Sequence, residues 1–144
     1  MVGADWVRAA LQVNPYGYQG RNAPSTRFSS EAAYNRALLD KCSELHISII
    51  AITDHWAVDT ATGLIQAAEA RGIVALPGFE ANTREGFHVL VIFEAGTPFT
   101  TVNAAIGACG VIPGCPNGTV GNPFDEILEA MTHPDLGALV IPAH

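Results

Sequence analysis

The stretch AITDHW, residues 51–56, ends an apolar run with a carboxylate and an imidazole side by side. The run as a whole, residues 47–53, has the length of a strand and no alternation of apolar and polar residues, which is typical of a strand of a parallel sheet covered on both faces. Asp54 and His55 follow at its end, although such side chains normally stay in water. The stretch therefore predicts a buried strand that delivers two polar groups to the edge of a sheet.

Segments of two kinds alternate along the rest of the chain. Further strand-length apolar runs are Ala9 to Val13, Ile73 to Pro77, Phe87 to Phe93 and Leu136 to Ile141. Amphipathic stretches at helical spacing are Ser30 to Leu45, Thr60 to Arg71, Thr100 to Ala108 and Pro123 to Thr132. Ser29 or Ser30 can cap the first of these helices, and Gly72 stands where the second should end. This order predicts an α/β domain.

Two stretches fit neither kind of segment. Residues 16–28 and 109–123 are rich in Gly, Pro and Asn and are longer than simple turns. Long ordered loops in compact domains are often functional, so we expect at least one of them to contribute to a site.

Length and composition limit the possible functions. The 144 residues suffice for one domain, residues 1–144, but are short for a complete α/β barrel of about 250 residues. Seven Lys and Arg against 14 Asp and Glu give a net charge of −7 without a basic cluster, so nucleic acid is not an expected partner of this segment. Three cysteines without a close pair favour a reducing, cytoplasmic setting. The apolar runs are far shorter than the roughly 20 residues of a membrane span, so we expect a soluble protein.

Ligand-capable side chains recur at the ends of the apolar runs. Asp54 and His55 follow the second run, Glu80 follows the third and His144 follows the last, while His88 stands at the start of the fourth. The carboxyl ends of parallel strands meet at one edge of a sheet, where sites are usually built. Neutral imidazole and carboxylate are the usual ligands of zinc, iron and manganese. The pattern predicts a site for a divalent transition metal, which would activate water for hydrolysis.

Each of these residues has an ordinary explanation when it is taken alone. His55 can be satisfied by local hydrogen bonds, Asp54 can cap the following segment, Glu80 can be a solvated acid in a turn, and His88 can be a surface residue. It is the recurrence at strand ends that indicates a site. His46 and His133 do not end strands in this way, and we assign them no role.

The order of the motifs resembles that of the polymerase and histidinol phosphatase (PHP) superfamily. The matching residues are TDH at 53–55, GFE at 78–80, His88 ahead of VLVIF, and PAH at 142–144. The resemblance implies a distorted (β/α)7 barrel that binds up to three zinc, manganese or iron ions and hydrolyses phosphate esters. It also implies that His55, Glu80, His88 and His144 are metal ligands, and that the catalytic residues are His55 and Asp54, the acid of TDH, which orients or supports the site.

The first motif of this family is altered here. The family opens with Asp-Leu-His-x-His, and the matching stretch AALQVNP has Ala10 in place of the acid and Gln12 and Asn14 in place of the two histidines. An amide oxygen is a weaker ligand for transition metals than imidazole. Because alternate residues of a strand share a face, we expect both amides to point into the cleft of His55 and Glu80.

The family's last ligands, an Asp-x-His pair, have no counterpart before His144. We therefore expect a partial barrel, truncated at its C-terminus, that forms the front part of a larger protein. Relatives with a similar leader imply a possible ATPase region downstream. Two functions remain open: a metal-dependent phosphoesterase acting on a small phosphorylated substrate, or a catalytically degenerate module that binds a nucleotide or phosphate, or regulates the attached ATPase.

Overall fold

The structure is a computed structural model in which residues 6–133 and 136–143 are described. Its five strands form one sheet in the order β1-β2-β3-β4-β5. The strands are β1 (Arg8–Val13), β2 (Ile47–His55), β3 (Val74–Asn82), β4 (His88–Ile92) and β5 (Leu139–Pro142). The α-helices are α1 (Glu31–Glu44), α2 (Thr62–Glu69), α3 (Phe99–Ala108) and α4 (Phe124–Met131), and two short 3-10 helices span Pro24–Thr26 and Asp59–Ala61. The chain is thus the α/β domain that the alternating segments predict.

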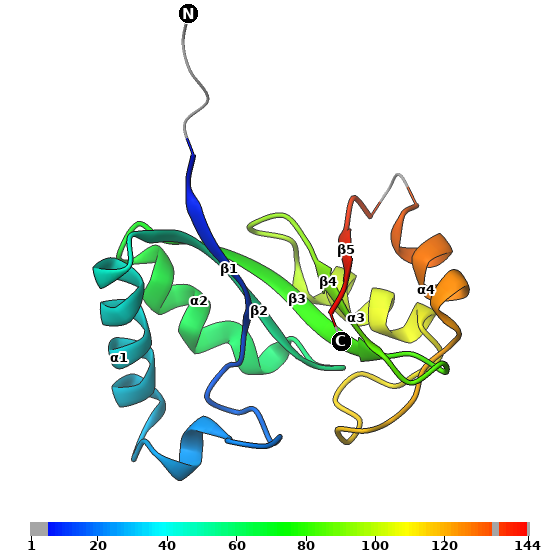
Figure 1. Ribbon diagram of the computed structural model, residues 1–144, viewed down its shortest axis with the longest axis horizontal. Coiled ribbons are helices and arrows are strands. Elements are labelled where there is room, and N and C mark those ends of the chain that lie inside the picture. The colour runs from blue at the N-terminus through cyan, green and yellow to red at the C-terminus, as the bar shows by residue number, and fades with distance from the viewer. Residues whose placement is uncertain (1–5, 134–135, 144) are drawn as a thin grey trace, which may run out of the picture.

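The strand directions change half-way across the sheet. Strands β1, β2 and β3 run parallel to one another, whereas β4 is antiparallel to both β3 and β5. The expectation of a parallel sheet is therefore correct for the first three strands and wrong for β4. The connection from β3 to β4 is a short turn, which joins antiparallel neighbours, whereas a parallel pair needs a longer crossover. The sheet is curled like half of a barrel wall (Figure 1).

The helices begin and end close to the residues that the sequence indicates. Ser30 is the N-cap of α1, where its Oγ accepts a hydrogen bond from the backbone N–H of Ala33 at 3.2 Å. Gly72, in the turn beyond α2, adopts φ +71°, a left-handed conformation that favours glycine. Pro123 precedes α4, a position that needs no backbone N–H.

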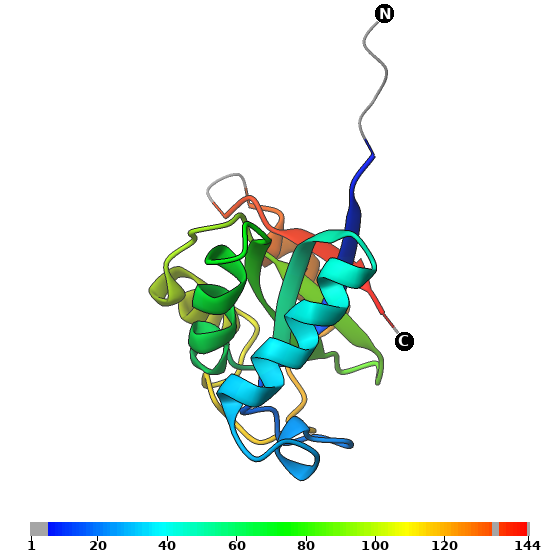
Figure 2. The same cartoon turned by 90° about the vertical axis from the view of Figure 1, so that its left-hand side faces the viewer.

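The helices pack against one face of the sheet. Helices α1 and α2 contribute Leu39, Cys42, Leu64 and Ala68 to a core cluster with Ile50 and Ile52 of β2. A second cluster, around α3 and α4, contains Phe79 of β3 and Val89 and Val91 of β4 together with Val102, Ile106 and Ile127. Seen from the side of α1 and α2, the helices stack over the sheet (Figure 2).

The other face of the sheet, which we call the inner face, has a much smaller apolar cluster. Ala51, Leu90 and Ile92 are buried there, with Leu11, Leu76 and Ile141 beside them. Leu139 in β5 is 53% exposed and Val74 in β3 is 45% exposed. Among the described residues, no helix is long and apolar enough to cross a membrane.

Candidate metal centre

Three ligand-capable residues meet on the inner face because of the register of three neighbouring strands. His55 is the last residue of β2 and lies opposite Glu80 of β3. His88 is the first residue of β4 and lies opposite Asn82, two positions beyond Glu80 on the same face. Because β4 runs in the reverse direction, its first residue lies at the edge where β2 ends. His88, at the start of its apolar run, therefore lies beside His55 and Glu80, which the sequence places after theirs.

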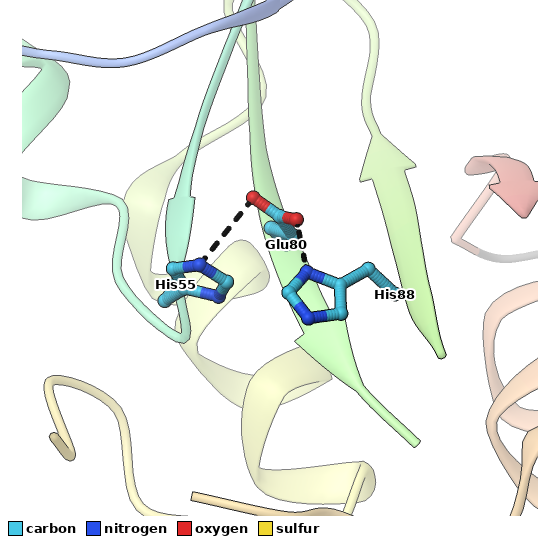
Figure 3. A group of neighbouring side chains, drawn as sticks. All are labelled: His55, Glu80 and His88. Carbon is cyan, nitrogen blue, oxygen red and sulfur yellow. Dashed lines mark hydrogen bonds and ion pairs between the residues drawn. The ribbon is translucent and has the colours of Figure 1, made fainter. Parts of the chain in front are cut away.

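The Glu80 carboxylate lies between the two imidazoles (Figure 3). Its Oε1 makes a short contact with Nδ1 of His88, and its Oε2 lies 3.6 Å from Nε2 of His55. Glu80 is only 3% exposed and His55 only 9%. A carboxylate withdrawn from water to this extent needs a cation, protonated partners or strong hydrogen bonds. The three side chains provide such partners for one another, and they leave a compact set of donor atoms.

This set of donors fits a divalent transition metal. One ligand atom from each of His55, Glu80 and His88 lies within 4.8 Å of the other two, so the three residues form a group that could hold a metal ion. Two ligand atoms on opposite sides of one ion with bonds of about 2.0–2.2 Å are at most about 4.4 Å apart, so only a small adjustment brings the group to bonding distance. Two imidazoles and one carboxylate also form a common ligand set of catalytic zinc, with one position left open.

The ring of His55 is fixed by its aromatic neighbours. Tyr18, in the loop between β1 and α1, stacks on it with ring centroids 6.0 Å apart and planes inclined by 26°. The ring of His88 meets it edge to face at 5.3 Å and 80°. After His55 the backbone turns sharply at Trp56, which adopts φ +52° and donates its backbone N–H to the Glu80 carbonyl at 3.2 Å. A non-glycine residue at positive φ is uncommon and tends to occur at functional sites.

Trp56 is held in this conformation by a loop that the sequence already marks as unusual. Its indole Nε1–H donates to the Thr119 carbonyl at 2.7 Å, and its own carbonyl accepts from Gly114 N–H at 2.7 Å. The amide of Asn82 donates to the same Thr119 carbonyl at 3.3 Å. Residues 109–123 therefore brace the turn that follows His55 and the end of β3, which carries Glu80.

Asp54 serves the turn that follows His55. Its Oδ1 accepts the backbone N–H of His55 at 2.8 Å, and its Oδ2 accepts the Thr60 hydroxyl at 2.9 Å. Burial raises the pKa of Asp54 above its ordinary value, an effect that these hydrogen bonds oppose. Asp54 pairs with Phe79 and so belongs to the face of the sheet that the helices cover. This geometry agrees with a role for Asp54 in supporting His55. A catalytic role for Asp54 stays a prediction.

The two amides of the altered first motif line one cavity, and Gln12 also contacts the site. Gln12 reaches the site, where its Nε2–H donates to Glu80 Oε2 at 3.2 Å. Asn14 lines the cavity, of about 260 Å³, beside Tyr34 and Arg27, and its backbone carbonyl accepts the Tyr34 hydroxyl at 2.6 Å. The pairing of β1 with β2 is irregular between Ala10 and Val13, which breaks the alternation on which the expectation of a shared face depends.

The fourth predicted ligand, His144, lies outside the described residues. The chain can be followed to Ala143, whose backbone N–H donates to the His88 carbonyl at 2.8 Å.

One neighbour of the site is missing from the sequence interpretation, namely Tyr18. It lies in a segment without periodicity, so no spacing rule relates it to the strand ends. The only signal is its place in the long loop of residues 16–28, for which the sequence predicts a function without saying which residue carries it.

Comparison with known proteins gives a likeness of fold only. No family model matches the chain, and no curated protein matches it. Among solved structures, a candidate metal-dependent phosphoesterase from Bifidobacterium adolescentis is similar at 17% identity and a TM-score of 0.48 over 72% of this chain and 32% of that protein. An amidohydrolase from Chromobacterium violaceum, solved with bound sulfate and no metal, is similar at 18% identity and a TM-score of 0.48 over 72% of this chain and 33% of that one. The chain thus spans about a third of the length of these two proteins.

Proposed function

We propose that this chain is a metal-binding part of a PHP-type phosphoesterase, and that it forms one domain over residues 1–144, the front part of a distorted (β/α)7 barrel in a longer protein. The observation that carries the proposal is the buried Glu80 carboxylate held between His55 and His88. The three groups come from the neighbouring strands β2, β3 and β4, of which β4 runs opposite to the other two. Imidazole and carboxylate are donors that divalent transition metals prefer.

The residues of the proposed site have two roles: some bind the ion, and others fix the position of its ligands. His55, Glu80 and His88 hold a zinc, manganese or iron ion, and His144 is the proposed fourth ligand, since Ala143 before it is bonded to the backbone of His88. When bound, such an ion polarises a phosphate ester and lowers the pKa of a water molecule so that it can attack phosphorus. Asp54 fixes the turn after His55, and Gln12 orients Glu80.

The proposed substrate is a small phosphorylated molecule or a nucleotide. A net charge of −7 without a basic cluster argues against binding of a long nucleic acid by this segment, because such binding relies on many phosphate contacts. A downstream ATPase region belongs to the same proposal and concerns the longer protein alone.

The second candidate function is a module that binds a phosphate or nucleotide, or regulates an attached ATPase, without hydrolysis. The contact of Gln12 with Glu80 favours it, because the amide nitrogen donates to the carboxylate and cannot act as a metal ligand in that orientation. An imidazole at this position would add a ligand, so the site here has fewer donors than the resemblance implies.

A hydrolysis assay on metal-loaded protein separates the two functions. The parent chain and a Glu80→Gln variant are each loaded with zinc, manganese or iron(II) and given para-nitrophenyl phosphate. The phosphoesterase predicts turnover by the parent and at least about tenfold less by the variant, because removing one donor weakens the ion's hold. Metal binding by the parent without turnover under any of the three metals indicates the non-hydrolytic module.

A further inference from the structure

The loop between β1 and α1 lies against the candidate metal centre through a single aromatic side chain. Tyr18 stacks on the imidazole of His55, with ring centroids 6.0 Å apart and planes inclined by 26°. Because His88 contacts the same imidazole edge to face, His55 has one ring from the sheet and one from the loop beside it. Nothing in the function proposed above uses Tyr18.

The loop that carries Tyr18 is anchored at several points. Tyr18 N–H donates to the Pro15 carbonyl at 3.1 Å, and the Tyr16 hydroxyl donates to the Phe28 carbonyl at 3.2 Å. Tyr34 of α1 packs against the rings of Tyr16 and Phe28, with centroids 6.2 and 5.4 Å away. Tyr18 is therefore delivered to His55 by a braced segment.

The position of the phenol also depends on a nearby glycine. A Cβ atom added at Gly20 would lie 1.9 Å from the Tyr18 hydroxyl oxygen and 2.1 Å from the ring carbon that bears it. Any other residue at position 20 would therefore displace the polar end of Tyr18. The absence of a side chain at Gly20 thus leaves room for the hydroxyl in its present position.

The Tyr18 hydroxyl can act as a hydrogen-bond donor to a ligand. A tyrosine hydroxyl carries one proton and can donate it in a hydrogen bond. A phosphate that approaches the centre meets the Glu80 carboxylate, whereas Asp54 lies on the other face of the sheet. A neutral hydroxyl near this carboxylate offers such an anion a hydrogen-bond donor.

From the stacking of Tyr18 on His55 and the space left by Gly20, we propose that Tyr18 is a substrate-binding residue whose hydroxyl donates a hydrogen bond to a phosphoryl oxygen held at the metal centre. The inference rests on the proposed function, since it requires the metal to bring phosphate to the site. It adds a ligand contact from the loop to a centre otherwise built from the sheet.

Two calorimetric titrations of the full chain test this contact. The first measures the affinity of each variant for the metal, and the second measures the affinity of the metal-loaded variant for inorganic phosphate. Tyr18→Phe removes the hydroxyl and keeps the ring, whereas Gly20→Ala keeps Tyr18 and displaces it. Gly107→Ala, which adds a methyl group in α3 where it meets nothing within 4 Å, is the matched control for Gly20→Ala.

We expect Tyr18→Phe to bind metal within about twofold of the parent and phosphate about tenfold more weakly, because a hydrogen bond to a charged group is worth at least this factor. Gly20→Ala should weaken phosphate binding to a similar extent, and Gly107→Ala should match the parent. Parent-like phosphate affinity in Tyr18→Phe overturns the inference while metal binding stands. Failure of the parent itself to bind metal overturns the proposed function, and the inference with it.

Discussion

His55 and His88 lie with their ring centroids 5.3 Å apart and their planes at 80°, although they come from strands that run in opposite directions. The reversal of β4 makes this possible, because it places the first residue of β4 beside the last residue of β2. Glu80 in β3, the strand between them, is then within reach of both imidazoles. One antiparallel strand in the half-barrel thus completes the ligand group.

Replacing Gly78 with alanine should destabilise the sheet near the site. A Cβ atom at this position would lie 2.5 Å from the backbone carbonyl of Val91 and 3.2 Å from Cγ2 of Thr53. Relief of this overlap would require the strands to move, and such overpacking typically costs about 1–3 kcal/mol. Thermal and guanidinium unfolding measure the loss.

Gly107→Ala is the matched control for that substitution. Gly107 lies within α3, and a Cβ atom there would meet nothing within 4 Å. Alanine in a helix is favoured over glycine by about 0.5–1 kcal/mol, so this variant should be slightly more stable than the parent. Equal unfolding midpoints for the two alanine variants would contradict the close approach at Gly78.

The three cysteines should differ strongly in their reaction with a thiol reagent. Cys115 is partly exposed, whereas Cys42 and Cys109 are buried. Burial raises the pKa of Cys42 and raises that of Cys109 to about 12. At pH 8 we therefore expect one fast-reacting thiol in the folded protein and three in guanidinium. Cys115→Ser should abolish the fast phase; a fast phase that persists would show that a buried thiol is open to solvent.

The raised pKa of Cys109 also predicts a loss of stability in alkali. The folded state keeps a proton that the unfolded state gives up, so this contribution is fully present below the ordinary thiol pKa of about 8.5 and is lost as the pH rises towards 12. Guanidinium unfolding at several pH values between 8 and 11 should show a steeper decline for the parent than for Cys109→Ala. Identical slopes would show that Cys109 does not ionise in this way.

Restoring an imidazole at position 12 should strengthen metal binding. Gln12 already contacts Glu80 Oε2 at 3.2 Å, so a histidine there starts close to the ligand group. We expect Gln12→His to raise the zinc affinity or the number of bound ions. Asn14→His is the informative control: Asn14 lies beyond the end of β1 and its backbone carbonyl bonds the Tyr34 hydroxyl, so this change should leave metal binding unchanged. The opposite order of effects would mean that β1 delivers Asn14, and not Gln12, to the site.

The sequence predicts most of the fold because the elements have strong local signals. The apolar runs and the helical spacing locate each strand and α-helix, although β3 extends five residues beyond the predicted Pro77, and Ser30, one of two possible caps, is the N-cap of α1. The apolar run of β4 does not show its direction, since a short run reads alike in both directions; the signal is the connection from β3, which is too short for a parallel crossover. The irregular pairing of β1 depends on contacts with β2 that no spacing rule contains.

The same distinction applies to the candidate site. The recurrence of His and Glu at strand ends brings together His55, Glu80 and His88, because strand register is set by the burial of one face. The place of Tyr18 depends on how a loop of irregular conformation folds back over the sheet. Such a contact follows from anchors at Tyr16, Phe28 and Tyr34 that become visible only in three dimensions.

The most direct test of the central claim is a zinc titration of the parent and of three single variants, His55→Ala, Glu80→Gln and His88→Ala. Controls are Glu94→Gln, an exposed acid, and His46→Asn, an exposed histidine at φ +54° where asparagine is tolerated. The account predicts that the parent and both controls bind zinc alike, while each of the three variants binds it at least about tenfold more weakly. Equal zinc affinity in the parent and all three site variants would contradict the account.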